Sequence, residues 1–131
     1  MSQIIDGTQL TWQVGAFRDY TLQYGTSFYH NLSTNPNRII ATTPVELHGE
    51  GAVIETASGW YVQVYGLNAD LKYMGSDRFA SAASTVTYSF DDVAYIVPCL
   101  RTTGGATAVY PSDVVDGLLT ITVAGGGCFN E

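Results

Sequence analysis

The chain has 131 residues, of which 46% are hydrophobic and 13% charged, a composition that excludes a disordered or solvating segment. No run of residues reaches the ~20 consecutive apolar positions of a bilayer span, so membrane insertion is not expected. The net charge of −7 at pH 7 would repel a phosphate backbone, so no nucleic-acid partner is expected either. The length fits one domain, residues 1–131, with a core of its own.

The N-terminal residues 1–6 lack the basic start and the apolar stretch of a signal peptide. We therefore expect the protein to reach its place of action through assembly or cell lysis, unless the chain is a piece of a longer secreted protein. Asn31-Leu32-Ser33 fits the N-glycosylation sequon, which matters only in a eukaryotic secretory pathway.

Short runs rich in Val, Ile, Thr and Tyr recur between clusters of Gly, Asn, Asp and Ser, whereas helical spacing of apolar residues is hard to find. This pattern predicts an all-β fold, a single jelly-roll type β-sandwich of about eight to nine antiparallel strands. In chain order, the predicted strands are Leu10–Phe17, Arg38–Thr42, Val45–His48, Ala52–Thr56, Trp60–Tyr65, Leu71–Met74, Thr85–Phe90, Val93–Arg101 and Leu118–Val123.

Three connections carry local signals of their own. Gly66–Asp70 holds Gly, Asn and Asp between two predicted strands, which favours a hairpin loop. Ser76–Ser84 consists mainly of small residues and predicts a short helix or a loop across one end of the sandwich. Pro111–Asp113 is typical of a turn, and we expect it to open a single helical turn that Ser112 caps.

The candidate binding surface follows from the alternation of side chains along two of these strands. Between Trp60 and Tyr65 the even positions are strongly apolar and belong in the core, which leaves the odd positions for the opposite face. The same parity along Val93–Arg101 separates Tyr95 and Arg101 from the core positions. If the two strands share a sheet, the candidate ligand-binding residues form an open platform: Tyr61, Gln63, Tyr65, Tyr95 and Arg101.

Such a platform suits sugars, because a pyranose ring stacks its C–H face on an aromatic ring while Gln and Arg bond its hydroxyls. Tyrosines also cover sheets without binding anything, and they supply rigid contact area at protein interfaces. Composition alone does not choose between a sugar and a protein partner. We assign Trp12 and Trp60 to the core, because both lie in strongly apolar strands.

No arrangement of residues points to catalysis, and we expect the protein not to be an enzyme. His30 and His48 are the only imidazoles, and no nucleophile elbow surrounds a serine. Glu46, Glu50 and Glu55 could flank a glycosidic bond, but three Glu around one hairpin are more typical of a solvated edge.

We expect no cofactor and no metal. Asp91-Asp92, and Asp113 with Asp116, could offer oxygen ligands to a structural calcium ion, but ordinary acidic turns are the simpler interpretation. Cys99 and Cys128 cannot build a four-ligand zinc site. They either form a disulfide that ties the tail to the body, or remain two thiols with Cys99 acting as a small apolar residue.

Five segments of the chain carry a family resemblance: Asn37–Thr42 (NRIIAT), Tyr61–Tyr65 (YVQVY), Leu71–Gly75 (LKYMG), Ala94–Arg101 (AYIVPCLR) and Tyr110–Val114 (YPSDV). Through them, from Arg38 onward, the chain resembles the carbohydrate-binding-module-like jelly-roll domains of Gram-positive gut bacterial surface proteins and of phage tail and virion proteins. It departs from these domains at the turn Tyr65–Asn68 and at Val97, where they often carry Arg.

The resemblance implies a non-catalytic surface-binding or adhesion module that recognises cell-surface glycan, within a phage virion or a bacterial surface assembly. Its expected location is therefore the virion or the cell surface. The alternative is a structural virion protein, a capsid decoration or tail component, whose aromatic face contacts other subunits or further copies of the chain.

Overall fold

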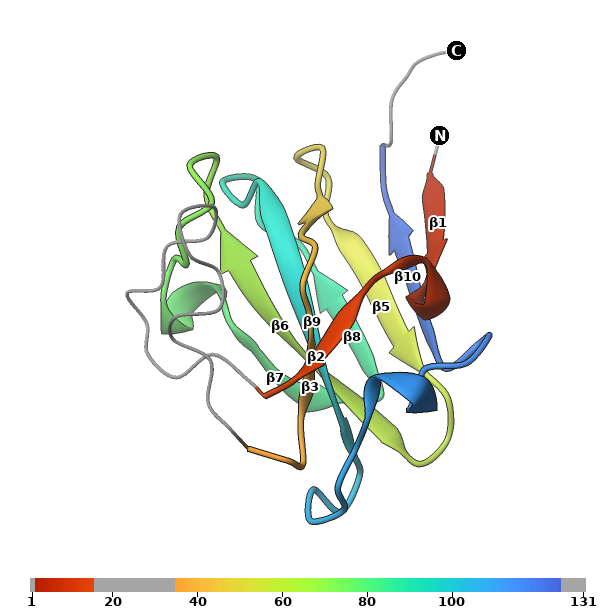
Figure 1. Cartoon of the computed structure of the whole chain (residues 1–131). Helices are drawn as coiled ribbons and strands as arrows, with labels where there is room; N and C mark the ends of the chain where they lie inside the picture. The colour runs from red at the N-terminus through yellow and green to blue at the C-terminus, as the bar shows by residue number, and fades with distance from the viewer. Residues whose placement is uncertain (1, 16–34, 126–131) are drawn as a thin grey trace.

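Two antiparallel β-sheets make up the part of the chain that the computed structural model describes, residues 2–15 and 35–125 (Figure 1). The four-stranded sheet has the order β1 (Gln3–Asp6), β10 (Leu119–Val123), β5 (Ala52–Thr56), β8 (Thr85–Tyr88). The six-stranded sheet has the order β2 (Trp12–Val14), β3 (Ile39–Ala41), β9 (Tyr95–Thr102), β6 (Trp60–Leu67), β7 (Ala80–Ala83), and β4 (Val45–Glu46) also pairs with β9. The predicted all-β sandwich is confirmed, while its jelly-roll type stays a prediction.

The main core lies between the two sheets and follows directly from side-chain alternation. In β10, for example, Leu119, Ile121 and Val123 are buried while Thr120 and Thr122 between them are half-buried on the outer face. Both sheets contribute to this cluster, the six-stranded one through Ile39, Val62, Val64, Ile96 and Leu100. As assigned from the sequence, Trp12 and Trp60 pack against the core, although both are only partly buried.

A second apolar cluster covers part of the outer face of the six-stranded sheet. It forms because β6 and β9 are apolar at positions of both parities, as strands buried on both faces are. Cys99 is fully buried in it as a free thiol, and burial raises the pKa of this thiol to about 12. Cys128 lies outside the described residues. The buried members are Ile40, Ala41, Tyr65, Leu67, Tyr73, Val97 and Cys99.

The hairpin predicted at Gly66–Asp70 is confirmed, but the strand predicted after it is wrong. The side-chain Oδ1 of Asn68 accepts hydrogen bonds from the backbone N–H groups of Asp70 (2.9 Å) and Lys72 (3.1 Å). Leu71 has φ of 62°, so the chain turns back within the loop. Residues Leu71–Met74 therefore form one isolated β-bridge, between Tyr73 and Leu67, instead of a continuously paired strand.

Two short strands were missed. Ser76–Ser84 contains a 3₁₀ turn, η2 (Ser76–Arg78), and then β7, an edge strand of small residues that pairs with β6. β1 pairs with β10 along its length, although its own sequence shows little alternation. Of the expected strand Leu10–Phe17 the structure shows β2 alone, and residues 16 and 17 lie outside the described residues.

Two further 3₁₀ turns are held by acidic side chains. Asp6 caps η1 (Gly7–Gln9), and hydrogen bonds from the hydroxyl and N–H of Thr8 and from the N–H of Gly117 lower the pKa of its carboxyl. In η3 (Pro111–Asp113) the expected cap by Ser112 is wrong. Asp113 instead accepts a 2.8 Å hydrogen bond from the N–H of Tyr110.

No helix among the described residues is long and apolar enough to cross a membrane.

Candidate functional site

The structure brings the predicted ligand-binding residues onto one face, the outer face of the six-stranded sheet. β6 and β9 are neighbours in this sheet (Figure 1). Their antiparallel register places Tyr61 opposite Arg101 and Leu67 opposite Tyr95, and the parity argument is therefore confirmed for both strands. Gln63 and Tyr65 lie between these two pairs on β6.

Tyr65 requires a correction, because its ring is not part of an open platform. Its side chain is only 7% exposed. The ring centroid lies 5.6 Å from that of Tyr73, in an edge-on arrangement, and 5.1 Å from that of Phe79. The hairpin causes this burial: Met74 donates its N–H to the carbonyl of Gly66, which folds the following chain back toward β6. Tyr65 is therefore a member of the second apolar cluster.

Tyr95 is also separated from the rest of the expected platform. It is half-buried and packs against the second apolar cluster. Since it lies six positions from Arg101 on the same strand, the two Cα atoms are about 20 Å apart. The predicted surface thus divides into an end with Tyr95 and an end with Tyr61, Gln63 and Arg101.

The Tyr61 end is the more organised of the two. The guanidinium carbon of Arg101 lies 5.4 Å from the centroid of the Tyr61 ring, a cation–π arrangement. Arg101 also donates from Nε to the carbonyl of Thr102 (3.1 Å) and from Nη2 to that of Thr103 (2.8 Å). These bonds hold the cation in place, and a guanidinium has five N–H donors, so further donors remain for a ligand.

A second cation reaches the same end and was missed in the sequence. Arg38 donates from Nη1 to the carbonyl of Gly105 at 3.3 Å and to that of Asn37 at 3.0 Å. A Cβ at Gly105 would lie 3.1 Å from Cζ of Arg101, so this turn touches both arginines. The spacing of residues 38 and 105 in the sequence does not predict this contact, because the contact arises only from the pairing of β3 with β9. We call Arg38, Tyr61, Gln63 and Arg101 the tyrosine–arginine surface.

The carboxylates considered for catalysis do not gather at one place. Glu46 belongs to the six-stranded sheet, Glu55 to the four-stranded one, and Glu50 to the loop before β5. All three are exposed, as is His48. His30 and the Asn31–Ser33 sequon lie outside the described residues.

Three of the four aspartates considered for calcium, Asp92, Asp113 and Asp116, are hydrogen-bonded to protein groups. Asp92 forms a two-point ion pair with Arg78, at 2.9 Å from Nε and 2.8 Å from Nη2, and this hydrogen bonding lowers the pKa of the Asp92 carboxyl. Asp116 lies 3.4 Å from the hydroxyl of Thr8. Within residues 2–15 and 35–125, no group of three or more His, Cys, Asp or Glu is arranged to hold a metal ion.

Comparisons of the chain with models of protein families, with curated proteins and with solved structures give no match.

Proposed function

We propose that the chain is a non-catalytic binding module that recognises a cell-surface glycan through its tyrosine–arginine surface, as part of a phage virion or a bacterial surface assembly. The observation that carries the proposal is the arrangement of Arg101 over the Tyr61 ring, with the guanidinium held by the carbonyls of Thr102 and Thr103. A rigid ring beside fixed donors is a preorganised contact, so little conformational entropy is lost when a ligand binds.

The groups on this surface match the two kinds of contact that a sugar offers. The half-buried ring of Tyr61 presents apolar area for a pyranose C–H face, and Gln63 can donate to and accept from sugar hydroxyls. Arg38 and Arg101 add positive charge to a chain whose net charge is −7. These two guanidiniums would donate hydrogen bonds to sugar hydroxyls, or to a single carboxylate on a sugar, at this surface.

Tyr61→Ala is expected to weaken glycan binding at least about tenfold, because it removes both the stacking ring and the support of Arg101. A glycan array with neutral and acidic wall polysaccharides would select the ligand, and titration calorimetry would measure the affinity. Tyr110→Ala is the matched control, since Tyr110 is 57% exposed and lies outside this surface. Absence of binding by the wild-type chain, or equal binding by Tyr61→Ala, would contradict the proposal.

A structural role in a virion is the second candidate, and the same surface favours it. Tyr and Arg are the residues enriched at the energetic centres of protein interfaces. In addition, Ile4 and Val115 are large apolar residues that are more than half exposed.

Under this second candidate, sedimentation velocity should show self-association, or association with capsid or tail proteins, that Tyr61→Ala reduces. The expected physical reason is loss of the ring from the centre of the contact. A chain that stays monomeric at every concentration and binds none of these proteins would count against a structural role.

A further inference from the structure

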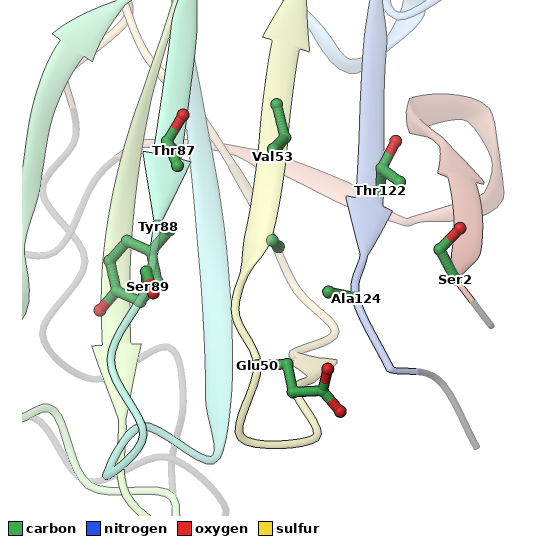
Figure 2. Close-up of a pocket in the computed structure, with 9 residues that line it drawn as sticks. Ser2, Glu50, Val53, Thr87, Tyr88, Ser89, Thr122 and Ala124 are labelled. Carbon is green, nitrogen blue, oxygen red and sulfur yellow. The ribbon is translucent and has the colours of Figure 1, made fainter. Parts of the chain in front are cut away.

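A small pocket opens on the outer face of the four-stranded sheet. This face carries none of the residues of the tyrosine–arginine surface. Side chains on this face form rows across the strands, because Thr122 of β10 pairs with Val53 of β5, and Val53 pairs with Thr87 of β8. The pocket lies at the end of these rows, over β5 and between β8 and β10 (Figure 2). Its volume is about 190 Å³.

The hollow lies where small residues follow the row of Val53, because Ser89 and Ala124 line its two sides. Gly51, the residue before β5, accepts a 3.0 Å hydrogen bond from the N–H of Ala124 and lies beside the backbone of Tyr88 and Ser89. Gly51 cannot easily be replaced: its φ is +86°, and a Cβ there would lie 2.4 Å from the carbonyl oxygen of Tyr88. A glycine here therefore lets the backbone before β5 lie close to the backbone of Tyr88 at this end of the pocket.

The chemistry of the lining is an apolar floor with a rim that accepts hydrogen bonds. Val53 and Ala124 contribute methyl groups, and the lining is mainly apolar. The hydroxyls at its edge belong to Ser2, Thr87, Ser89 and Thr122.

Glu50 is the only charged residue among the described residues that line the pocket, and it stands at the pocket's mouth (Figure 2). Its carboxylate packs closely against Gly125: a Cβ on that glycine would lie 2.3 Å from Oε2. Gly125 has φ of +74°, so a side chain there is disfavoured in any case. The end of β10 therefore leaves room for the carboxylate at this rim.

We propose that this pocket receives the side chain of a lysine presented by a partner protein. A lysine has an apolar stem of four methylenes that would lie on the alanine and valine methyls, and a compact ammonium that would donate to Glu50 and to the rim hydroxyls. The chain's net charge of −7 attracts a cationic partner before contact. The inference does not depend on the glycan proposal, because the two surfaces lie on different sheets.

Other ligand classes fit the lining less well. A sugar would bring many hydroxyls onto a mainly apolar floor and leave most of them without partners. An arginine fits less well because its aliphatic stem is shorter than that of lysine and covers less of the apolar floor. Its planar guanidinium is suited to two-point binding by a carboxylate rather than to a small pocket. An uncharged aliphatic side chain would fill the volume but would leave Glu50 without a counter-charge.

The test is a titration of the ¹⁵N-labelled full chain with a capped pentapeptide that has lysine at its centre, followed by two-dimensional NMR. We expect shifts of the amide signals of Val53, Thr87 and Ala124 and a Kd of about 1–10 mM, as befits a single side chain. Glu50→Gln should weaken this binding about two- to fivefold, as expected for an exposed ion pair, and salt should weaken it as well. Glu55→Gln is the matched control, because Glu55 is an exposed glutamate near the far end of β5, and it should leave the Kd unchanged.

Three comparison ligands complete the experiment: the same peptide with norleucine, the same peptide with arginine, and butylamine. Equal binding of the norleucine peptide would overturn the role of the charge, and tighter binding of the arginine peptide would overturn the choice of lysine. If butylamine bound at least tenfold more tightly than the lysine peptide, the pocket would be assigned to a free amine. The proposal of a protein partner would then be wrong. Absence of shifts with the lysine peptide would overturn the site itself, whatever the result with glycans.

Discussion

Gly66→Ala is expected to destabilise the protein by about 2–3 kcal/mol, because the added methyl group has no room on the inner side of β6. A Cβ at Gly66 would lie 2.2 Å from the hydroxyl oxygen of Tyr88 and 3.0 Å from the carbonyl oxygen of Arg78. That hydroxyl donates a hydrogen bond to this same carbonyl, and the ring of Tyr88 is almost fully buried in the core. The substitution must therefore break the bond or shift a packed ring. Urea unfolding followed by tryptophan fluorescence would give the free energy.

Gly104→Ala is the matched control for this substitution. A Cβ at Gly104 meets no atom within 4 Å, so the change in unfolding free energy should stay within about 0.5 kcal/mol. A double-mutant cycle with Tyr88→Phe adds a sharper readout. Removing the hydroxyl should relieve part of the cost of Gly66→Ala, so the two changes should not be additive. Equal stability of the Gly66→Ala and Gly104→Ala proteins would show that the inner side of β6 is not packed as described.

Ile121→Ala is expected to cost about 3–4 kcal/mol, the largest effect of any single change that we predict. Ile121 has no exposed surface, and it lies in β10 between Ile5 of β1 and Ile54 of β5, to which it is paired by register. Replacing it by alanine removes methylene contacts and leaves a cavity that its neighbours on two other strands cannot fill. Thermal and chemical unfolding would both report the loss.

Ile4→Ala provides the control, since it deletes the same atoms from a residue that is 68% exposed. Ile4 lies on the neighbouring strand β1 and pairs with Thr122, so the local backbone context is similar. Its cost should be about 0.5 kcal/mol or less. If Ile4→Ala destabilised the chain as much as Ile121→Ala, the assignment of inner and outer faces in the four-stranded sheet would be wrong.

The elements that sequence reasoning located well are those whose pattern is imposed by burial on one or both faces. β5, β6, β9 and β10 all coincide closely with predicted strands, because each presents buried apolar residues at regular positions. β7 was not found, since alanine and serine carry little strand signal and the strand forms only because β6 offers an edge. The strand expected at Leu71–Met74 failed for the opposite reason: its residues favour a strand, but the preceding turn directs them away from a ladder.

The candidate site likewise has a part that the sequence predicted and a part that it did not. Parity correctly placed Tyr61, Gln63, Tyr65, Tyr95 and Arg101 on one face, because the two-residue period of a strand is a local property. Parity carries no information about what covers that face. The burial of Tyr65 under Tyr73 and Phe79 depends on how the hairpin folds back, so it was not visible in the sequence.

By itself, the sequence determined that this chain is an all-β sandwich and which residues of β6 and β9 face away from its core, because backbone geometry and burial act on neighbouring residues. Only the tertiary structure decided the rest. It brought Arg38 to the turn that also touches Arg101, and it set Ser89 and Ala124 on the two sides of a pocket beside Glu50. These contacts join residues far apart in the chain, so they depend on strand order and register, which no local pattern encodes.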